Sequence, residues 1–323
     1  MNASPAHLRL VPAEGGAGRL CPYDYRYSPR VFARAPDFAA ETLYVIGGLY
    51  GNLAALAAVE KLAARERTPV MQVFNGDFHW FDAEPDWFAA VERGVAPHRA
   101  LRGNVETELA RTADIGAGCG CAYPESVSAD VVERSNEILA QLQAAAPTET
   151  RQRLARLPMH LVAKVGGLRI GIVHGDATAL AGWRFAQNEL DDAKRLGWLD
   201  EIHGAAQVDV FASTHTCLAA LRDFFFGRGR LTVINNGAAG MPNFGGKRFG
   251  LITRIATTPS PHPPLYGIER DRVHIDAIAL PYDHDAFLGR FHKRWPQGSP
   301  AHASYYSRIV DGPDYAIAQA ELR

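Results

Sequence analysis

The chain is organised around the stretch Val73-Phe74-Asn75-Gly76-Asp77-Phe78-His79-Trp80-Phe81-Asp82. The apolar run from Val70 to Phe74 predicts a short buried β-strand. It ends at Asn-Gly, and two aspartates and a histidine follow within a few residues. In open α/β sheets, ligands bind at the C-terminal ends of strands, so a carboxylate there is well placed to hold a metal ion. Asn-Gly-Asp is also ordinary turn chemistry, and the stretch alone does not choose between the two interpretations.

Length and composition fit a large α/β enzyme domain. The chain has 323 residues, of which 47% are hydrophobic and 21% charged, enough for a sizeable buried core. A formal net charge of −1 gives no sign of attraction to nucleic acid or to a membrane surface. The apolar runs are too short to cross a bilayer. With no signal-peptide pattern, we expect a cytoplasmic protein.

The chain has four irregularly spaced cysteines, Cys21, Cys119, Cys121 and Cys217. Their number and spacing fit neither a disulfide framework nor a zinc ribbon, so we expect reduced thiols. No histidine stands beside them in a recognisable nucleophile–base motif. None of them is therefore expected to be a catalytic nucleophile.

Periodicity predicts alternating strands and helices along most of the chain. Strands are expected at 43–46, 70–74, 159–164, 168–173, 208–212, 230–235, 249–256 and 272–280. The segments 159–164 and 168–173 are expected to form a hairpin that turns at Gly166-Gly167. Helices are expected at 53–63, 85–91, 107–113 and 180–198, and one or two amphipathic helices at 127–156. The Pro-rich segment 257–270 is expected to be a loop.

Polar, glycine-flanked clusters recur in order after successive strands. They occupy residues 47–52, 76–82, 103–106, 174–176 and 213–216. Each has an ordinary interpretation: a single histidine such as His174 is more often a hydrogen-bonded structural residue, and Asn104 after glycine is usually a turn. Their recurrence at strand ends favours a common site. Asp, Asn and His ligands suit Mn, Fe or Zn.

This ordered series resembles the motifs of the calcineurin-like metallophosphoesterases. The matching stretches are Gly48-Leu49-Tyr50-Gly51-Asn52, Gly76-Asp77, Gly103-Asn104-Val105-Glu106, His174-Gly175-Asp176 and Ala212-Ser213-Thr214-His215. The resemblance covers roughly residues 41 to 280. It implies an α/β fold, a four-layer α-β-β-α sandwich of two mixed sheets. The metallophosphoesterase-like domain is expected over 39–285, after an irregular lead-in over 1–38 and before a C-terminal extension over 286–323.

The resemblance implies four metal ligands, Asp77, Asn104, His174 and His215. It also implies that Asn52 holds the site or the phosphate. The family's usual pair of metal sites is incomplete here, because Gly48 and Tyr50 replace its first aspartate and histidine, Ser213 replaces the first histidine of its late pair, and Val105 replaces the histidine that assists the leaving group.

Neighbouring residues are candidates to compensate for the lost ligands. His79 is the best of them, because its loop already carries Asp77. Asp82, Glu106, Asp176, Cys119, Cys121 and Cys217 also stand near matched positions. Tyr50 is expected to donate a hydrogen bond where a ligand is missing.

We therefore expect metal-dependent hydrolysis of a small phosphate mono- or diester or a nucleotide. The site residues are Asp77, Asn104, His174, His215 and His79 for the metal, and Asn104, His174, Asn52 and Tyr50 for catalysis. At most one divalent transition metal, Mn, Fe or Zn, is expected per chain, held by Asp77, Asn104 and His174. The alternative is a catalytically inactive member of the family that binds a ligand or a protein partner.

Overall fold

The computed structural model describes residues 16–321, and two mixed six-stranded sheets form its centre. One sheet has the strand order β11-β12-β10-β2-β3-β4 and the other the order β1-β5-β6-β7-β9-β8. The first contains β2 (Thr42–Ile46), β3 (Val70–Asn75), β4 (Arg99–Leu101), β10 (Gly250–Ala256), β11 (Pro264–Arg270) and β12 (Val273–Leu280). The second contains β1 (Phe38–Ala40), β5 (His160–Val165), β6 (Leu168–Val173), β7 (Val210–Ser213), β8 (Ala219–Phe226) and β9 (Gly229–Asn236).

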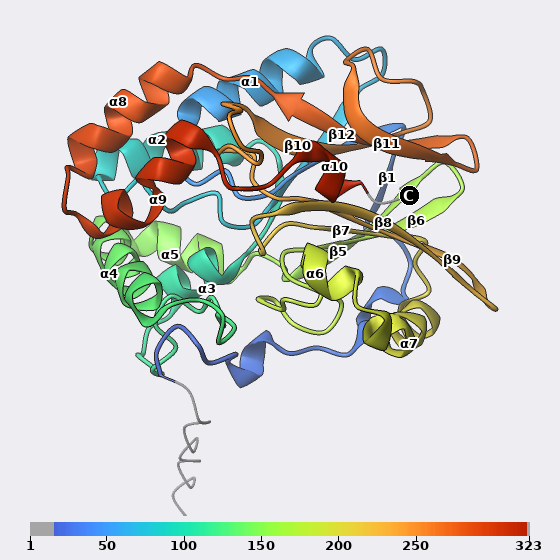
Figure 1. Ribbon diagram of the computed structural model, residues 1–323, viewed down its shortest axis with the longest axis horizontal. Coiled ribbons are helices and arrows are strands. Elements are labelled where there is room, and N and C mark those ends of the chain that lie inside the picture. The colour runs from blue at the N-terminus through green and yellow to red at the C-terminus, as the bar shows by residue number, and fades with distance from the viewer. Residues whose placement is uncertain (1–15, 322–323) are drawn as a thin grey trace, which may run out of the picture.

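Helices cover both outer faces of the stacked sheets (Figure 1). The helices are α1 (Leu53–Ala63), α2 (Pro85–Val95), α3 (Asn104–Ala110), α4 (Ala129–Ala145), α5 (Thr148–Ala155), α6 (Gln187–Leu190), α7 (Leu196–Ala206), α8 (His284–Arg294), α9 (Pro300–Asp311) and α10 (Ile317–Ala320). The layers are helices, sheet, sheet and helices, which confirms the predicted four-layer sandwich. Among the described residues, no helix combines the length and apolar character that crossing a bilayer requires.

Strand β2 shows how the sheets are buried on both faces. Leu43 and Val45 belong to the core between the two sheets, whereas Tyr44 and Ile46 belong to the core beneath α1 and its neighbouring helices. All five residues of the strand are buried. A continuous apolar run is what a strand covered on both sides requires, because successive side chains point to opposite faces.

The predicted elements are largely present, but the expected helix over 180–198 is wrong. Only α6, a short 3-10 turn and the start of α7 lie in this segment. The carboxylate of Asp176 instead accepts hydrogen bonds from the backbone amides of Thr178, Ala179 and Arg184. Because the Asp176 side chain satisfies these amides, the segment does not need helical hydrogen bonds there. It remains an irregular loop, and its apolar residues Leu180 and Phe185 are buried.

The expected Pro-rich loop at 257–270 is also wrong in part, because it contains β11. This strand pairs antiparallel with β12 at the edge of its sheet, with a register shift between Pro264 and Tyr266. Proline is tolerated at the start of an edge strand, where no partner needs its missing amide. Strand β8, which pairs with β9, was not predicted.

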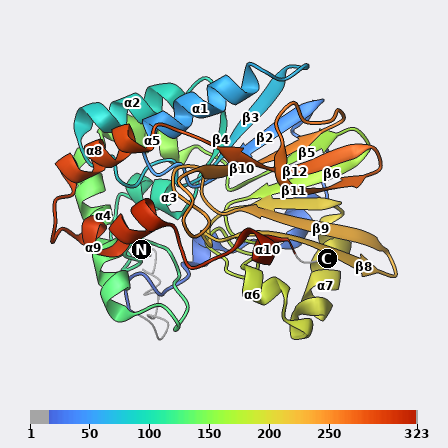
Figure 2. The ribbon, with the colours of Figure 1, turned by 45° about the horizontal axis from the view of Figure 1, so that its top comes forward.

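The N-terminal lead-in falls partly outside the described residues, since residues 1–15 are not among them. The described part forms two 3-10 turns, Tyr23–Tyr25 and Pro29–Phe32, before β1 pairs in parallel with β5. At the other end, α8 and α9 lie on the same side of the molecule as α4 (Figure 2). Trp295, between them, is fully buried and its indole nitrogen donates to the carbonyl of Phe81, at 2.8 Å.

We predict that Trp295→Ala lowers the free energy of unfolding by about 3–5 kcal/mol, because it leaves a large cavity beneath α8. Chemical denaturation measures this loss. Trp295→Phe is the matched control and should cost less, since it keeps a ring but removes the hydrogen bond to Phe81. A loss below about 1 kcal/mol for the alanine variant would show that α8 is not part of the cooperative core.

Candidate metal centre

Four side chains from four strand ends meet at one edge of the sandwich. Asp77 follows β3, Asn104 begins α3 after β4, His174 follows β6 and His215 follows β7. Ligand atoms of Asp77, His174 and His215 all lie within 4.8 Å of one another. They converge because parallel strands deliver their C-terminal ends to the same edge of a sheet.

His174 Nε2 lies at the centre of this cluster. It is 3.3 Å from Asp77 Oδ2, 3.2 Å from Asn104 Oδ1 and 3.1 Å from His215 Nδ1. All four side chains are at least nine-tenths buried. The structure thus brings together the four residues that the sequence proposed as principal ligands.

Outer hydrogen bonds fix which atoms face the cluster. In three of the four side chains, the nitrogen that points away donates to a backbone carbonyl: His174 Nδ1 to Asn75 at 2.9 Å, His215 Nε2 to Cys121 at 3.0 Å and Asn104 Nδ2 to Cys119 at 3.0 Å. With these protons committed outward, lone pairs of two nitrogens and two oxygens face one point. Such a set of acceptors needs positive charge at its centre, and N and O donors with carbonyl-anchored imidazoles fit a divalent transition metal.

The electrostatics of the cluster favour a positive charge beside Asp77. Burial disfavours a charge on Asp77, but the neighbouring His174 outweighs it and lowers the pKa of Asp77. Burial likewise disfavours His174 imidazolium, yet the Asp77 carboxylate raises the pKa of His174 overall. Burial and the charge on His174 lower the pKa of His215 to about 3, so His215 remains a neutral donor. The cluster therefore attracts positive charge towards its centre.

Glu106 ties the two ligand-bearing loops together. Its fully buried carboxylate accepts hydrogen bonds from the amides of Asp77 at 2.8 Å, Phe78 at 3.0 Å, His79 at 3.3 Å and Gly103 at 2.9 Å. Burial and the nearby Asp77 carboxylate raise the pKa of Glu106. Since Glu106 is committed to backbone amides, it fixes the positions of Asp77 and Asn104 and is not itself part of the ligand cluster.

Gly76 allows these loops to approach one another. A Cβ atom on Gly76, which has φ +78°, would lie 2.5 Å from Gly103 N and 2.6 Å from His174 Nδ1. Asp77 follows with φ 51°, a left-handed conformation that is unusual for a residue other than glycine. The Asn-Gly-Asp sequence is thus both the turn and the ligand-bearing loop, since the turn is what directs Asp77 into the cluster.

His79 does not join the cluster. Its imidazole is fully buried, with Nδ1 2.5 Å from Asp82 Oδ2 and Nε2 2.7 Å from Glu92 Oε1, and it stacks on the ring of Phe88. Burial disfavours the imidazolium, but Asp82 and then Glu92 raise the pKa of His79 to about 9. His79 therefore anchors its loop to α2 as a cation, with both ring nitrogens already engaged.

Tyr50 fills the space beside Gly48. A Cβ atom on Gly48 would lie 2.8 Å from Tyr50 Cε2, so the ring leaves no room for a ligand side chain at position 48. The Tyr50 hydroxyl lies 2.9 Å from Cys217 Sγ. Tyr50 and Cys217 both adopt positive φ, 52° and 60°, which is a strained conformation of the kind found at functional sites.

Asn52 lies outside the cluster and organises the loop before α1. Its Oδ1 accepts from Ala55 N at 3.0 Å and caps the helix, while its Nδ2 donates to Gly240 O at 2.9 Å. With both polar ends of its side chain engaged by backbone, Asn52 positions the loop that carries Tyr50.

The other candidate ligands are also committed elsewhere or lie on the cavity wall. Asp82 pairs with His79, and Asp176 caps its own loop. Cys121 and Cys217 line the cavity above the cluster, and Cys119 is buried beside them. All four cysteines lie within the described residues, and none forms a disulfide. Burial raises the pKa of both Cys121 and Cys217, the opposite of what activates a thiol nucleophile.

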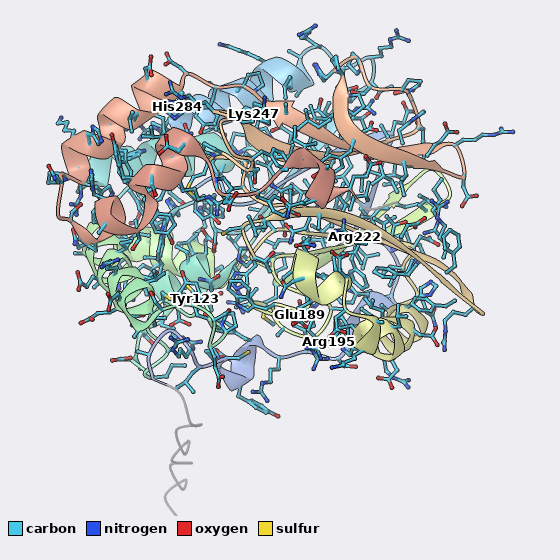
Figure 3. All side chains as sticks on the ribbon, in the orientation of Figure 1. Tyr123, Glu189, Arg195, Arg222, Lys247 and His284 are labelled. Carbon is cyan, nitrogen blue, oxygen red and sulfur yellow. The ribbon has the colours of Figure 1, made fainter. Side chains whose placement is uncertain are left out.

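A small cavity of about 40 Å³ opens above the cluster. It is lined by Tyr50, Asp77, Trp80, Asn104, Val105, Cys121, Tyr123, Trp183, His215, Cys217 and Tyr305. This volume is the space in which the centre of a water-sized sphere fits, and one water molecule needs about 10–15 Å³ by that measure, so the cavity has room for a few water molecules or a small polar group. Tyr123, labelled in Figure 3, lies beside α3 and α4, and Tyr305 comes from α9.

No pattern in the sequence pointed to Tyr123, Trp183 or Tyr305 as part of the site. The 116–123 loop, which supplies two anchoring carbonyls, also accepts the Trp183 indole N–H at Cys121 O, 3.0 Å away. The sequence feature that could have pointed to this loop is the alternation of glycines at 116, 118 and 120, which all have positive φ. Tyr305 lies about 200 residues along the chain from Asn104, so no local pattern could have placed it here.

Comparison with solved structures identifies proteins of the same architecture. A metallophosphoesterase from Sphaerobacter thermophilus matches with a TM-score of 0.54 and 17% identity over 85% of this chain and 100% of that one. A hypothetical protein from Pyrococcus horikoshii OT3 matches with a TM-score of 0.58 and 17% identity over 85% of this chain and 99% of that one. No family model and no curated protein sequence matches this chain. At this identity the likeness establishes the fold, and it agrees with the predicted two-sheet sandwich.

The His79 network predicts a specific pH dependence of stability. Because the folded-state pKa of His79, about 9, lies above its ordinary value of 6.5, its contribution is fully present below about pH 6.5. It is lost as the pH rises through 9. We expect the difference in unfolding free energy between wild type and His79→Gln, measured with chelator present, to shrink from pH 6 to pH 9.5.

The His79→Gln variant also tests whether His79 only supports its loop or binds the metal. His79→Gln should retain the metal content of the wild type after purification under mild conditions, because no ring nitrogen of His79 faces the cluster. A variant that folds but has lost its metal would place His79 among the ligands, contrary to the geometry.

Proposed function

We propose, from the calcineurin-like phosphoesterase fold of this chain, that it is a hydrolase that uses one divalent transition metal to cleave phosphoric esters. The observation that carries the proposal is the meeting of four inward-facing acceptors beneath a cavity: Asp77, Asn104, His174 and His215. Mn, Fe and Zn suit this mixture of carboxylate, amide and imidazole donors. We also propose a cytoplasmic location.

When bound, the metal would polarise the phosphoryl oxygens and lower the pKa of a water molecule that attacks phosphorus. In the overall reaction, the water oxygen bonds to phosphorus, the bond to the ester oxygen breaks, and the departing oxygen acquires a proton. His174 and His215 are held in the ligating tautomers by the carbonyls of Asn75 and Cys121. Their fixed orientation avoids reorganisation during the reaction.

Tyr50 supplies a hydrogen-bond donor at the cavity wall. Burial, then Cys217 and Asp77, raise the pKa of Tyr50 well above its ordinary range, so the phenol keeps its proton. We assign it a hydrogen bond to a phosphoryl oxygen. Val105, which also lines the cavity, offers no proton to the departing oxygen. Esters with acidic leaving groups, such as p-nitrophenyl esters, should therefore be the better substrates.

The single-metal assignment follows from the two degenerate positions. The Tyr50 ring blocks a side chain at Gly48, and Ser213 offers only a hydroxyl, for which the described residues provide no hydrogen-bond partner. Among the described residues, one cluster of three or more His, Cys, Asp or Glu has ligand geometry. Two-metal clamping of both the attacking and leaving oxygens is therefore absent from this proposal, and turnover should be slow.

A second candidate function is a binding module without catalysis. The observation that favours it is the small cavity, about 40 Å³, beside the ring that fills the first site. This alternative predicts phosphate or metal binding without turnover of activated esters.

We predict one equivalent of Mn, Fe or Zn per chain and slow hydrolysis of p-nitrophenyl esters. Asp77→Ala and His174→Ala should each reduce metal affinity and activity by more than about tenfold, since each removes a ligand. Elemental analysis and a colorimetric assay measure both. His79→Gln is the matched control, because it alters a buried histidine of the same region without touching the cluster.

Three results would contradict parts of this proposal. Two equivalents of metal in the wild type would overturn the single-metal assignment. Unchanged metal content and turnover in both alanine variants would remove the cluster from the function. A wild type that holds its metal but hydrolyses no aryl ester would favour the binding module.

A further inference from the structure

We infer that this site selects singly charged tetrahedral esters, such as phosphate diesters, over doubly charged phosphate monoesters. The inference rests on the proposed function, because it requires a divalent ion in the cluster. It concerns the charge of the ligand, which the fold and the ligand cluster do not by themselves specify.

The charge of the cavity wall is the first argument. Among the described residues that line the cavity, Asp77 is the carboxylate, and there is no lysine or arginine. His215 lines the cavity, and His174 behind it would hold the metal through Nε2. A divalent ion and the Asp77 carboxylate therefore leave one net positive charge facing a ligand.

The thiols and phenols on the wall do not change this balance. The phenols of Tyr50 and Tyr123 and the thiols of Cys121 and Cys217 line the cavity as uncharged polar groups. They can donate hydrogen bonds, but they neither add nor remove charge.

Two charged groups lie just behind the wall, and their charges oppose each other. Glu106 accepts hydrogen bonds from backbone amides beside Asp77 and carries a carboxylate. Arg308 of α9 donates from Nη2 to Cys217 O at 2.6 Å and acts on Tyr50 and Cys217 from that side. Glu106 disfavours a bound anion and Arg308 favours one. Because their effects oppose each other, the net charge set by the metal and Asp77 remains.

The walls make an unmatched charge costly. Trp80, Val105, Tyr123, Trp183 and Tyr305 line the cavity, so much of the surface that faces a bound ligand is aromatic or apolar. In such a weakly polar enclosure, charge–charge energies are larger than in water, and an uncompensated charge carries a desolvation cost. A monoanionic ester neutralises the site, whereas the second charge of a monoester dianion has no partner.

The direct test is calorimetric binding of two small phosphates to the Zn²⁺-loaded protein. Dimethyl phosphate carries one negative charge at all the pH values used. Methyl phosphate loses its second proton near pH 6 and carries two charges above it. At pH 8 we expect dimethyl phosphate to bind at least tenfold more tightly, and we expect the difference to close as the pH falls to 5.5.

The dimethyl phosphate arm is its own control for loss of metal at low pH. Its affinity should change little over the range, whereas loss of Zn²⁺ would weaken both ligands. Methyl phosphate that binds as tightly as dimethyl phosphate at pH 8 would overturn the inference.

A charge introduced at Val105 provides a second test. Val105 is 2% exposed, lines the cavity and carries no charge. Val105→Lys should improve methyl phosphate binding relative to dimethyl phosphate by at least tenfold at pH 8. Val105→Met introduces a side chain that is similar in size to lysine but uncharged. It should leave the ratio of the affinities for methyl phosphate and dimethyl phosphate as in the wild type. A lysine variant that binds one equivalent of Zn²⁺ but shows no change in ratio would count against the inference.

Turnover distinguishes failure of this inference from failure of the proposed function. Methyl p-nitrophenyl phosphate should be hydrolysed faster than p-nitrophenyl phosphate at pH 8. Hydrolysis of p-nitrophenyl sulfate as well would show that charge, rather than phosphorus, is selected. Preference for the monoester would leave the phosphoesterase proposal standing and reject the charge selection. If neither phosphate binds or reacts with the Zn²⁺-loaded protein, both proposals fall.

Discussion

The buried carboxylate of Glu106 is the constraint on which the site depends. It satisfies amides from the Asp77 turn and from Gly103 at the start of α3, two segments separated by a helix and a strand. Charge-assisted hydrogen bonds to several backbone amides offset the cost of burying an anion. Because these loops are joined, Asp77 and Asn104 reach the cluster with little freedom, and the histidines from the other sheet complete it.

A second layer of backbone carbonyls converts proximity into ligand geometry. Carbonyls of Asn75, Cys119 and Cys121 take the outward protons of His174, Asn104 and His215 respectively. The imidazole and amide lone pairs are thereby turned inward before any ion binds. This arrangement explains why a Gly/Cys loop without a recognisable zinc spacing is nevertheless central to the site: its carbonyls, not its thiols, hold the ligands.

Aromatic and apolar side chains fill the region beside Gly48. Tyr50 occupies the space beside Gly48, and Trp183 and Tyr305 wall the cavity with the thiols of Cys121 and Cys217. The proposed metal would therefore be the one cationic centre in weakly polar surroundings. Both the slow proposed chemistry and the proposed charge selectivity follow from that arrangement.

The sequence by itself determined the strand ends and the four principal ligand candidates, because apolar runs and glycine-flanked polar clusters are local signals that recur in order. It misplaced His79, since proximity to Asp77 along the chain does not predict side-chain direction after two residues with positive φ. The tertiary structure alone decided that His79 faces Asp82 and Glu92, and that Tyr305 from α9 closes the cavity. The contact of His79 with Glu92 of α2 and the position of Tyr305 depend on packing between separate segments, which no local pattern encodes.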